Sequence, residues 1–202
     1  MIDMGLRGGR YGEGSAFDLS LRTLDQHPHG LDLGPLQPNL AARLKTESKA
    51  IEAAPAVLLA DLQRFAAQQP PSAAQLLLIG RRHVRSNNSW MHNFHRLVKG
   101  KPRHQLLMHP EDLAGRQLQD GQRVRVTSRV GTIEVDVLAS TDMMPGVVSL
   151  PHGFGHARPG VLLDIASAQG GASANDLTDE RLIDALSGNA VLNGVPVEVV
   201  AA

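Results

Sequence analysis

The feature that most constrains the fold is a pair of alternating segments in the second half of the chain. Residues 123–128 alternate polar and apolar side chains, and so do residues 132–137. Strict alternation is typical of a strand with one buried face. The intervening Arg129-Val130-Gly131 is short enough to join two such strands directly. The sequence therefore predicts a β-hairpin that packs one face against a core.

Other short apolar runs accompany this hairpin. We expect buried strands at residues 75–79, 106–108 and 147–150, and a terminal strand at 195–200. Because proline lacks an amide hydrogen, Pro196 predicts that the terminal strand lies at a sheet edge. Helices are expected from Pro110 onward and over residues 178–186, where acidic residues occupy the first turn. Many short strands with few helices predict a small β-barrel.

The first third of the chain lacks this pattern. Residues 1–70 contain many glycine and proline breakers, and they include one amphipathic segment, residues 56–65, directly after Pro55. We therefore predict two regions. Residues 1–70 form an irregular arm with one short helix, and residues 71–202 form the barrel.

Composition narrows the function classes. The chain has no cysteine, which excludes disulfide scaffolds, Cys-ligated zinc and iron–sulfur clusters held by this chain. Its 20 Lys and Arg residues balance 20 Asp and Glu residues, so only a local patch can indicate a charged partner. No apolar segment suits a membrane span or a signal peptide. We expect a soluble, cytoplasmic protein without a membrane partner.

The polar run from Arg81 to His104 is the strongest candidate for a binding function. It contains seven Lys or Arg residues, no acid and the only tryptophan of the chain. It directly follows a predicted buried strand, and loops on a rigid scaffold often carry binding groups. Arginine, serine and asparagine donors bind phosphate oxygens. The run predicts a planar, phosphate-bearing ligand, and a solvated basic loop is the alternative.

Two further segments carry weaker signals. Residues 151–156 are glycine-rich and place His152 and His156 four residues apart, a spacing that suits a metal only on a helix. Gly153 and Gly155 argue against a helix, and no third ligand is evident, so a tight turn with surface histidines explains the segment better. Residues 174–179 are explained most simply by a helix N-cap at Asp176 or Thr178.

Taken in order, these segments resemble the C-terminal domain of the bis-molybdopterin guanine dinucleotide oxidoreductases. That family includes formate dehydrogenases, nitrate reductases and dimethyl sulfoxide reductases. The matching segments of the barrel region are residues 78–82, 86–93, 107–114, 120–126, 131–133, 144–148, 152–153 and 175–178. Residues 27–36 and 51–55 of the arm are similar to the segment that precedes this domain. The resemblance covers nearly the whole chain.

The resemblance implies a fold and a set of cofactor contacts. The fold would be mainly β with short helices, as a double-psi β-barrel of about six strands. The loop after the first strand would contact the pterin and pyrophosphate of a dinucleotide, and two later positions would contact pterin or nucleotide. The implied contacts are Arg81, Arg82, Ser86, Asn87, Asn88, Ser89, Trp90, His92, Asn93, His152, Gly153 and Asn175.

The resemblance also implies what this chain lacks. In the family, the molybdenum ligand and any iron–sulfur cysteines lie in upstream domains. We therefore expect a fragment of a molybdenum-dependent oxidoreductase that has no catalytic residue or metal ligand of its own and no redox activity alone. Its partners would be the upstream catalytic domains of the same enzyme and the dinucleotide. The molybdenum bis(molybdopterin guanine dinucleotide) cofactor would belong to the intact enzyme and be absent from the isolated fragment.

Two other functions stay open at the level of sequence. A small β-barrel could bind nucleic acid through residues 81–104, with Trp90 and Phe94 stacking on bases. The zero net charge and the sparse aromatic residues disfavour this alternative. A histidine-based metal-binding protein is disfavoured by the missing third ligand.

Overall fold

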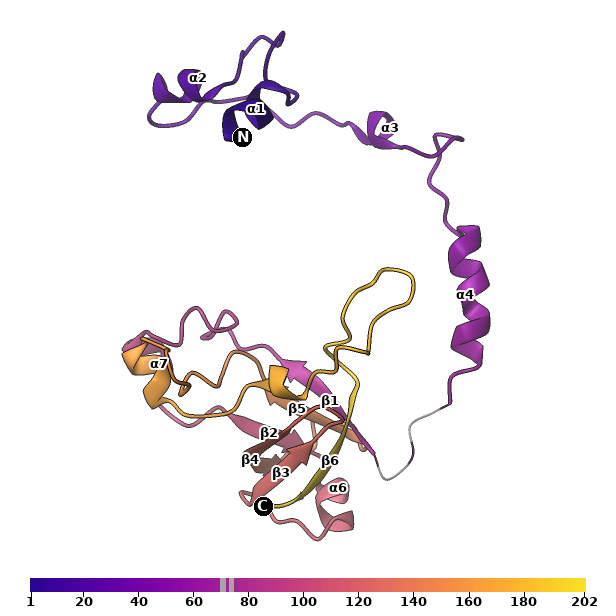
Figure 1. The fold of residues 1–202 in the computed structure, drawn as a ribbon, viewed down its shortest axis with the longest axis vertical. Coiled ribbons are helices and arrows are strands. Elements are labelled where there is room, and N and C mark those ends of the chain that lie inside the picture. Colours follow the sequence, from indigo (N-terminus) through magenta and orange to yellow (C-terminus); the bar gives the residue numbers. More distant parts are fainter. Residues whose placement is uncertain (70–71, 73–74) are drawn as a thin grey trace. The chain divides into compact units, whose positions relative to one another are not determined.

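The structure is a computed structural model that describes residues 1–69, 72 and 75–202. The chain divides into two compact units, residues 1–59 and residues 60–202 (Figure 1). The boundary that we predicted between residues 70 and 71 lies outside the described residues.

Residues 1–59 form short helices joined by turns. They contain α1 (Ile2–Arg7), α2 (Leu21–Asp25) and α3 (Leu40–Arg43). The Asp3 carboxylate accepts hydrogen bonds from Leu21 N at 2.8 Å and from Arg7 Nε at 2.7 Å, which fixes the start of α2 beside α1. No large apolar side chain of residues 1–59 is buried, so local polar contacts hold this unit rather than a hydrophobic core.

The helix predicted after Pro55 is confirmed as α4 (Ala56–Ala66). Its Leu58, Leu62 and Phe65 side chains are 52%, 57% and 67% exposed.

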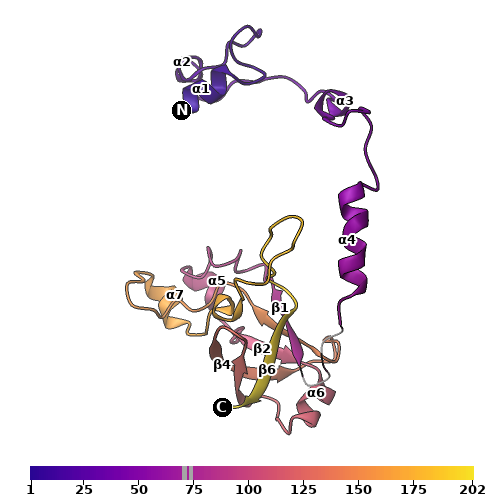
Figure 2. The same cartoon turned by 45° about the vertical axis from the view of Figure 1, so that its right-hand side comes forward.

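The second unit is a closed six-stranded barrel, so the predicted fold class is confirmed (Figures 1 and 2). The strands follow one another around the barrel in the order β1-β5-β2-β4-β3-β6. Two pairs are parallel, β1 with β5 and β2 with β4, and the other four pairs are antiparallel. This is the double-psi arrangement. The strands are β1 (Leu76–Arg81), β2 (Gln105–Met108), β3 (Arg123–Thr127), β4 (Thr132–Ala139), β5 (Val147–Pro151) and β6 (Val195–Ala201).

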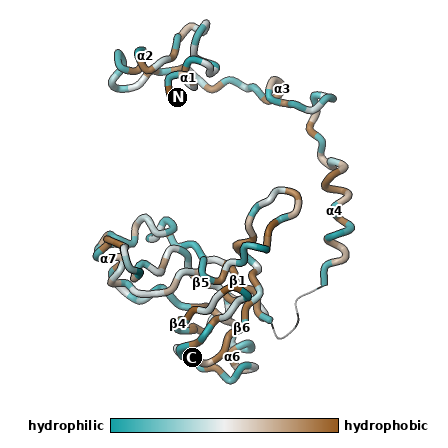
Figure 3. Tube along the Cα trace, in the orientation of Figure 1, coloured by the Kyte–Doolittle hydropathy of each residue, from teal (hydrophilic) through white to brown (hydrophobic). Residues whose placement is uncertain are grey.

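The predicted hairpin is confirmed as β3 and β4, and its alternation builds the core. Val124 pairs with Val135 and Val126 with Ile133, and all four side chains are at most 6% exposed. The tube in Figure 3 is hydrophobic along much of β1, which contributes Leu76 and Leu78 to the same core. The buried side chains of this core are aliphatic or methionine, which explains how a chain with 3% aromatic residues forms one.

The predicted helix after His109 is confirmed as α6 (Pro110–Gly115). His109 caps it by accepting a hydrogen bond from Glu111 N, and Pro110 occupies its first turn. The Asp112 carboxylate accepts a hydrogen bond from Gly146 N at 2.7 Å, which ties α6 to the beginning of β5.

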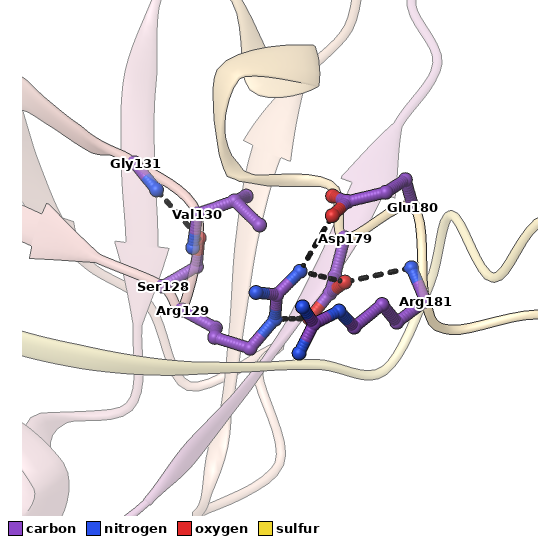
Figure 4. Close-up of polar contacts among 7 residues, drawn as sticks. All are labelled: Ser128, Arg129, Val130, Gly131, Asp179, Glu180 and Arg181. Carbon is purple, nitrogen blue, oxygen red and sulfur yellow. Dashed lines mark hydrogen bonds and ion pairs between the residues drawn. The ribbon is translucent and has the colours of Figure 1, made fainter.

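The helix predicted over residues 178–186 is wrong. A short 3₁₀ helix, η1 (Ala174–Leu177), ends before this segment, and residues 178–194 form an irregular loop. Local side-chain hydrogen bonds replace the helical ones, because the Asp179 carboxylate accepts from Arg181 N at 2.8 Å and binds Arg129 (Figure 4). Asp184 likewise accepts from Ser187 N at 2.8 Å.

The edge position predicted for the terminal strand is also wrong, because β6 pairs with β1 on one side and β3 on the other. Pro196 lies opposite Leu77 of β1, whereas the pairing with β3 begins only at Glu198. Proline is tolerated because β6 has a partner on one side only at this residue.

No helix in the described part of the chain is long and apolar enough to cross a membrane.

Candidate functional site

The barrel topology brings two long loops to one end. β1 and β5 are parallel neighbours, and their last residues, Arg81 and Pro151, lie in register. The loops that follow them, residues 82–104 and 152–194, therefore leave the barrel side by side. The first loop contains α5 (His95–Val98) and the second contains α7 (Asp164–Ala168), and both views show these segments on the same side of the barrel (Figures 1 and 2).

Arg81 and Arg82, which are adjacent in sequence, differ in their surroundings. The Arg81 guanidinium turns towards the barrel, where it donates to Ser149 O at 3.1 Å and Gln105 O at 3.0 Å. Burial lowers its pKa. Arg82 is exposed. Arg81 thus joins β5 to β2, and Arg82 is the arginine of this pair that faces solvent.

Residues 86–93 form a tight loop whose backbone touches the second loop. Asn87 and Asn88 adopt left-handed backbone angles, with φ of 42° and 60°, a conformation that asparagine tolerates. Gly153 has φ of +87°, and a Cβ atom there would overlap the Asn88 carbonyl and crowd Ser89 N. The predicted segments around Asn88 and Gly153 are therefore in direct contact.

The same two loops contribute three imidazoles and a phenyl ring that contact one another. The Phe154 ring lies between His92 and His104, at centroid distances of 4.5 Å and 4.8 Å. His92 Nδ1 lies 3.1 Å from His156 Nε2, a distance at which one imidazole donates to the other. His104 Nε2 lies 2.9 Å from the Ala172 carbonyl oxygen, which anchors the ring. We call these four residues the imidazole cluster.

His92, His104 and Phe154 of the imidazole cluster border a cavity of about 270 Å³, which we call the basic cavity. Four cationic side chains line it and only one acid does, Asp136, whose carboxylate lies 3.1 Å from Arg123 Nη1. The lining residues that bear on function are Arg85, Ser86, His92, Lys101, Arg103, His104, Arg123, Asp136 and Phe154.

His92, one of the residues that line this cavity, contains a buried ring nitrogen without a partner. Its side chain is 3% exposed, and within the described residues its buried Nε2 has no hydrogen-bond partner in good geometry. Buried polar atoms are normally paired, so the unpaired and enclosed Nε2 is an exception among the described residues.

The surroundings of His92, His104 and His152 lower the pKa of each and so favour the neutral imidazole. Burial lowers the pKa of His92, and His156 lowers it further, against an opposing effect of the Gly153 backbone. Burial also lowers the pKa of His104, against the Ala172 carbonyl. Burial and, to a lesser extent, Arg82 lower the pKa of His152. These side chains therefore act at neutral pH as hydrogen-bonding groups, while the fixed positive charge comes from arginine and lysine.

The predicted site residues do not form one cluster. Ser86 and His92 line the basic cavity, whereas Arg82, Asn87 and Asn88 line a separate, shallower hollow of about 620 Å³ with His83, Val84 and Met91. His152 follows β5 directly and its N–H donates to Arg81 O at 3.1 Å, beside both loops. Trp90 is 80% exposed and lines neither space.

Two predicted residues have other partners in the structure. Asn93 Oδ1 accepts hydrogen bonds from Ile165 N at 3.0 Å and Ala166 N at 3.1 Å, which caps α7. Asn175 is exposed on η1, whose carbonyls pack against Gly131 of the hairpin turn, and it lines neither cavity.

Of the nine residues named above as lining the basic cavity, sequence reasoning predicted only Ser86 and His92 as cofactor contacts. His104, Phe154 and His156 were not singled out as cofactor contacts, although His104 ends the basic run and the other two lie in the glycine-rich segment. The sequence feature that the three residues share is that each lies in or at the end of a segment predicted to bind a ligand. Their meeting depends on the parallel pairing of β1 and β5, which no local pattern encodes.

The histidine spacing does not build a metal centre. His156 pairs with His92, whereas His152 packs against Gly80 at the end of β1. Within the described residues, no group of three or more metal-binding side chains is present.

Comparison with known proteins decides the family. The family model of the molydopterin dinucleotide binding domain matches residues 76–196, more than half of the chain. The chain belongs to this family. The match begins with β1 and ends in β6, so the dinucleotide binding domain is the barrel together with both of its long loops.

Two larger proteins are similar to this dinucleotide binding domain. A tetrathionate reductase subunit from Salmonella typhimurium is 27% identical over 121 residues, which cover 52% of this chain and 12% of that protein. The structure of acetylene hydratase from Pelobacter acetylenicus aligns with a TM-score of 0.55 and 17% identity. That alignment covers 71% of this chain and 20% of acetylene hydratase, and it shows a shared fold. This chain thus spans a small part of the length of both.

Proposed function

We propose that this chain forms one wall of a molybdopterin guanine dinucleotide site in a molybdenum-dependent oxidoreductase. The observation that carries the proposal is the pair of loops at the ends of β1 and β5, joined where Gly153 meets Asn88. The match to a family of dinucleotide binding domains indicates the class of ligand. When bound, the cofactor would supply the redox chemistry, which this chain's residues do not.

The residues present fit such a ligand. Arg82, Asn87 and Asn88 line the open hollow, where an arginine and two amides suit phosphate and heterocycle edges. The positive φ of Gly153 lets backbone approach closely without a Cβ atom.

We propose that the opposite wall and the molybdenum ligand come from catalytic domains of the same enzyme. Exposed apolar side chains on both loops suit such a neighbour, since Val84 is 92%, Trp90 80% and Leu162 91% exposed. A single wall buries only part of a dinucleotide, so the isolated chain should bind it weakly and purify without it.

The proposal is tested with GDP, which carries the guanosine and pyrophosphate of the cofactor. In an NMR titration up to about 10 mM, which detects even millimolar affinity, we expect amide shifts confined to residues 82–93 and 152–156. Arg82→Gln should weaken binding by up to about fivefold, the worth of an exposed ion pair. Arg125→Gln, on the outer face of β3, is the matched control and should change nothing. ADP in place of GDP tests the preference for guanine.

Two results would overturn the proposal. The first is the absence of any shift in these loops at the highest GDP concentration. The second is single-stranded DNA binding that is tighter than GDP binding and falls steeply with salt, which would favour the nucleic-acid alternative.

A further inference from the structure

We propose that the His92–His156 pair is a pH-sensitive switch that holds the two long loops together at neutral pH and releases them in acid. His92 belongs to the loop that follows β1, and His156 belongs to the loop that follows β5. The switch concerns the loops themselves and needs no ligand. Only its effect on dinucleotide binding rests on the proposed function.

The contact between the two imidazoles tolerates only one extra proton. His92 Nδ1 lies 3.1 Å from His156 Nε2, and the rings meet edge-on with an interplanar angle of 83°. A hydrogen bond of this kind needs one protonated and one bare nitrogen, whichever ring is the donor. If both imidazoles are cations, an N–H faces an N–H and two positive charges lie within hydrogen-bond distance. The contact therefore holds only while at least one ring is neutral.

The surroundings of His92 oppose the second proton. The side chain is buried, and within the described residues its other ring nitrogen, Nε2, has no hydrogen-bond partner. Both ring nitrogens of a cationic imidazole carry a hydrogen, so the enclosed N–H would stay unpaired. Burial lowers the pKa of His92, and His156 and Arg103 lower it further against the opposing effect of the Gly153 backbone.

The neighbouring charges do not compensate a second proton. Of the described residues that line the adjoining basic cavity, Asp136 is the only acid, and its carboxylate lies 3.1 Å from Arg123 Nη1. Farther along the second loop, Asp164 of α7 is exposed and Asp176 of η1 pairs with Arg158. Separation of the loops therefore relieves repulsion within a positive environment. The charged and titratable residues that line the cavity are Arg85, Lys101, Arg103, His104, Arg123 and Asp136.

His104, the third imidazole of the cluster, lacks this sensitivity. Its Nε2 lies 2.9 Å from the Ala172 carbonyl oxygen. Because a carbonyl oxygen carries no proton, His104 keeps this hydrogen bond when it is protonated. Acid therefore acts on the contact between the loops through the His92–His156 pair.

The direction of the pH dependence follows from proton linkage. The joined loops lower the pKa of His92 below its ordinary value of 6.5, so in acid the separated loops bind more protons. The contact is therefore at full strength above pH 6.5 and weakens as the pH falls below this value. For one proton, the ratio of joined to separated loops falls by up to about tenfold for each pH unit.

The switch is tested by NMR of the full chain between about pH 8 and pH 5, across the ordinary titration range of histidine. Asn93 Oδ1 accepts from Ile165 N and Ala166 N across the loops, so the exchange protection of these two amides reports the joined state. After correction for intrinsic exchange, their protection should fall by up to about tenfold for each pH unit below the ordinary histidine pKa. His92 and His156 should titrate as a coupled pair. Amides of β3 and β4 should keep their protection.

His156→Gln is the variant that removes the switch and keeps the contact. A glutamine amide does not titrate and can donate to His92 Nδ1 or accept from it, so protonation of His92 no longer breaks the hydrogen bond. This variant should keep its loop protection in acid. His95→Gln, which removes an exposed imidazole on α5, is the matched control and should behave as the wild type.

Two results would overturn the switch. The first is loop protection in the wild type that does not fall with pH, which decides the question even if His156→Gln does not fold. The second is an equal loss of protection in the wild type and in folded His156→Gln.

GDP binding at about pH 7.5 and about pH 5.5 separates this inference from the proposed function. Because a terminal phosphate also gains a proton in this range, the wild type is compared with His156→Gln. A larger loss of affinity in the wild type supports both inferences. Loops that separate in acid while GDP binds at neither pH support the switch and refute the proposed function. GDP binding at both pH values with unchanged loop protection supports the proposed function and refutes the switch.

Discussion

At the scale of single residues, Asp179 is the described carboxyl group of the barrel whose pKa is shifted furthest. Its side chain is 7% exposed, and it binds Arg129, which also donates to Glu180 at 2.9 Å (Figure 4). The hydrogen bond from Arg129 lowers the pKa of Asp179 to about 2. The pair fastens the loop after η1 to the turn of the β3–β4 hairpin.

We predict that Asp179→Asn destabilises the barrel at neutral pH and that this difference from the wild type shrinks in acid. Because the pKa of Asp179 in the folded state is depressed from 3.8 to about 2, its contribution is complete above pH 3.8. It is lost as the pH falls through about 2. Urea unfolding of both proteins across this pH range measures the difference. Asp142→Asn, at an exposed turn residue, is the control, and a difference that does not vary with pH would refute the prediction.

The sequence showed which side chains could form hydrogen bonds or ion pairs. It did not show which partners they bind in the folded chain. Asp179 suited the first turn of a helix, but Arg129, fifty residues earlier in the chain, binds its carboxylate. Asn93 suited a ligand contact, but it caps α7. Both outcomes depend on long-range neighbours, which explains why the basic loop was found from sequence and the roles of its single residues were not.

At the scale of elements, the contact between the β3–β4 turn and η1 depends on Gly131. A Cβ atom at this position would overlap the carbonyl oxygen of Asp176, and a backbone atom cannot move aside as a flexible side chain does. We therefore predict that Gly131→Ala destabilises the chain by about 1–3 kcal/mol, the usual cost of overpacking. Urea unfolding checks this value.

Gly115→Ala, at the end of α6, is the matched control because the space around it is open. We expect no comparable loss for that variant. Equal effects of the two substitutions would show that close approach to η1 is not what requires glycine at position 131.

The elements themselves were largely predictable from the sequence, since alternation and proline positions are local signals. β3 and β4 alternate along their length, and Pro110 begins α6. Strand pairing was not predictable in this way. Pro196 suggested an edge, yet the barrel closes through β6, because closure is a property of all six strands together.

At the scale of the whole molecule, the order of the motifs predicted the barrel. The parallel pairing of β1 with β5 then places the loops that follow these two strands next to each other. The two predicted loops are seventy residues apart in the chain and start side by side in space. That both loops contact the same ligand was predicted only from the family resemblance. The imidazole cluster, which needs residues from both loops, forms only in the folded barrel.

The two units of the chain differ in what stabilises them, and this predicts independent stability for the barrel. Every residue of the hydrophobic core lies between Leu76 and Val199, and none belongs to residues 1–59. Removing residues 1–59 should therefore change the free energy of unfolding of the barrel by no more than about 0.5 kcal/mol, as for changes away from a core. Urea unfolding followed by circular dichroism compares the full chain with residues 60–202.

A core substitution makes this comparison stringent. Leu106 is fully buried, so Leu106→Ala should cost about 2–5 kcal/mol in both the full chain and the shortened one. Equal losses would mean that the same core unfolds in each. A shortened chain that unfolds at markedly lower urea, or that responds differently to Leu106→Ala, would instead show that residues 1–59 stabilise the barrel.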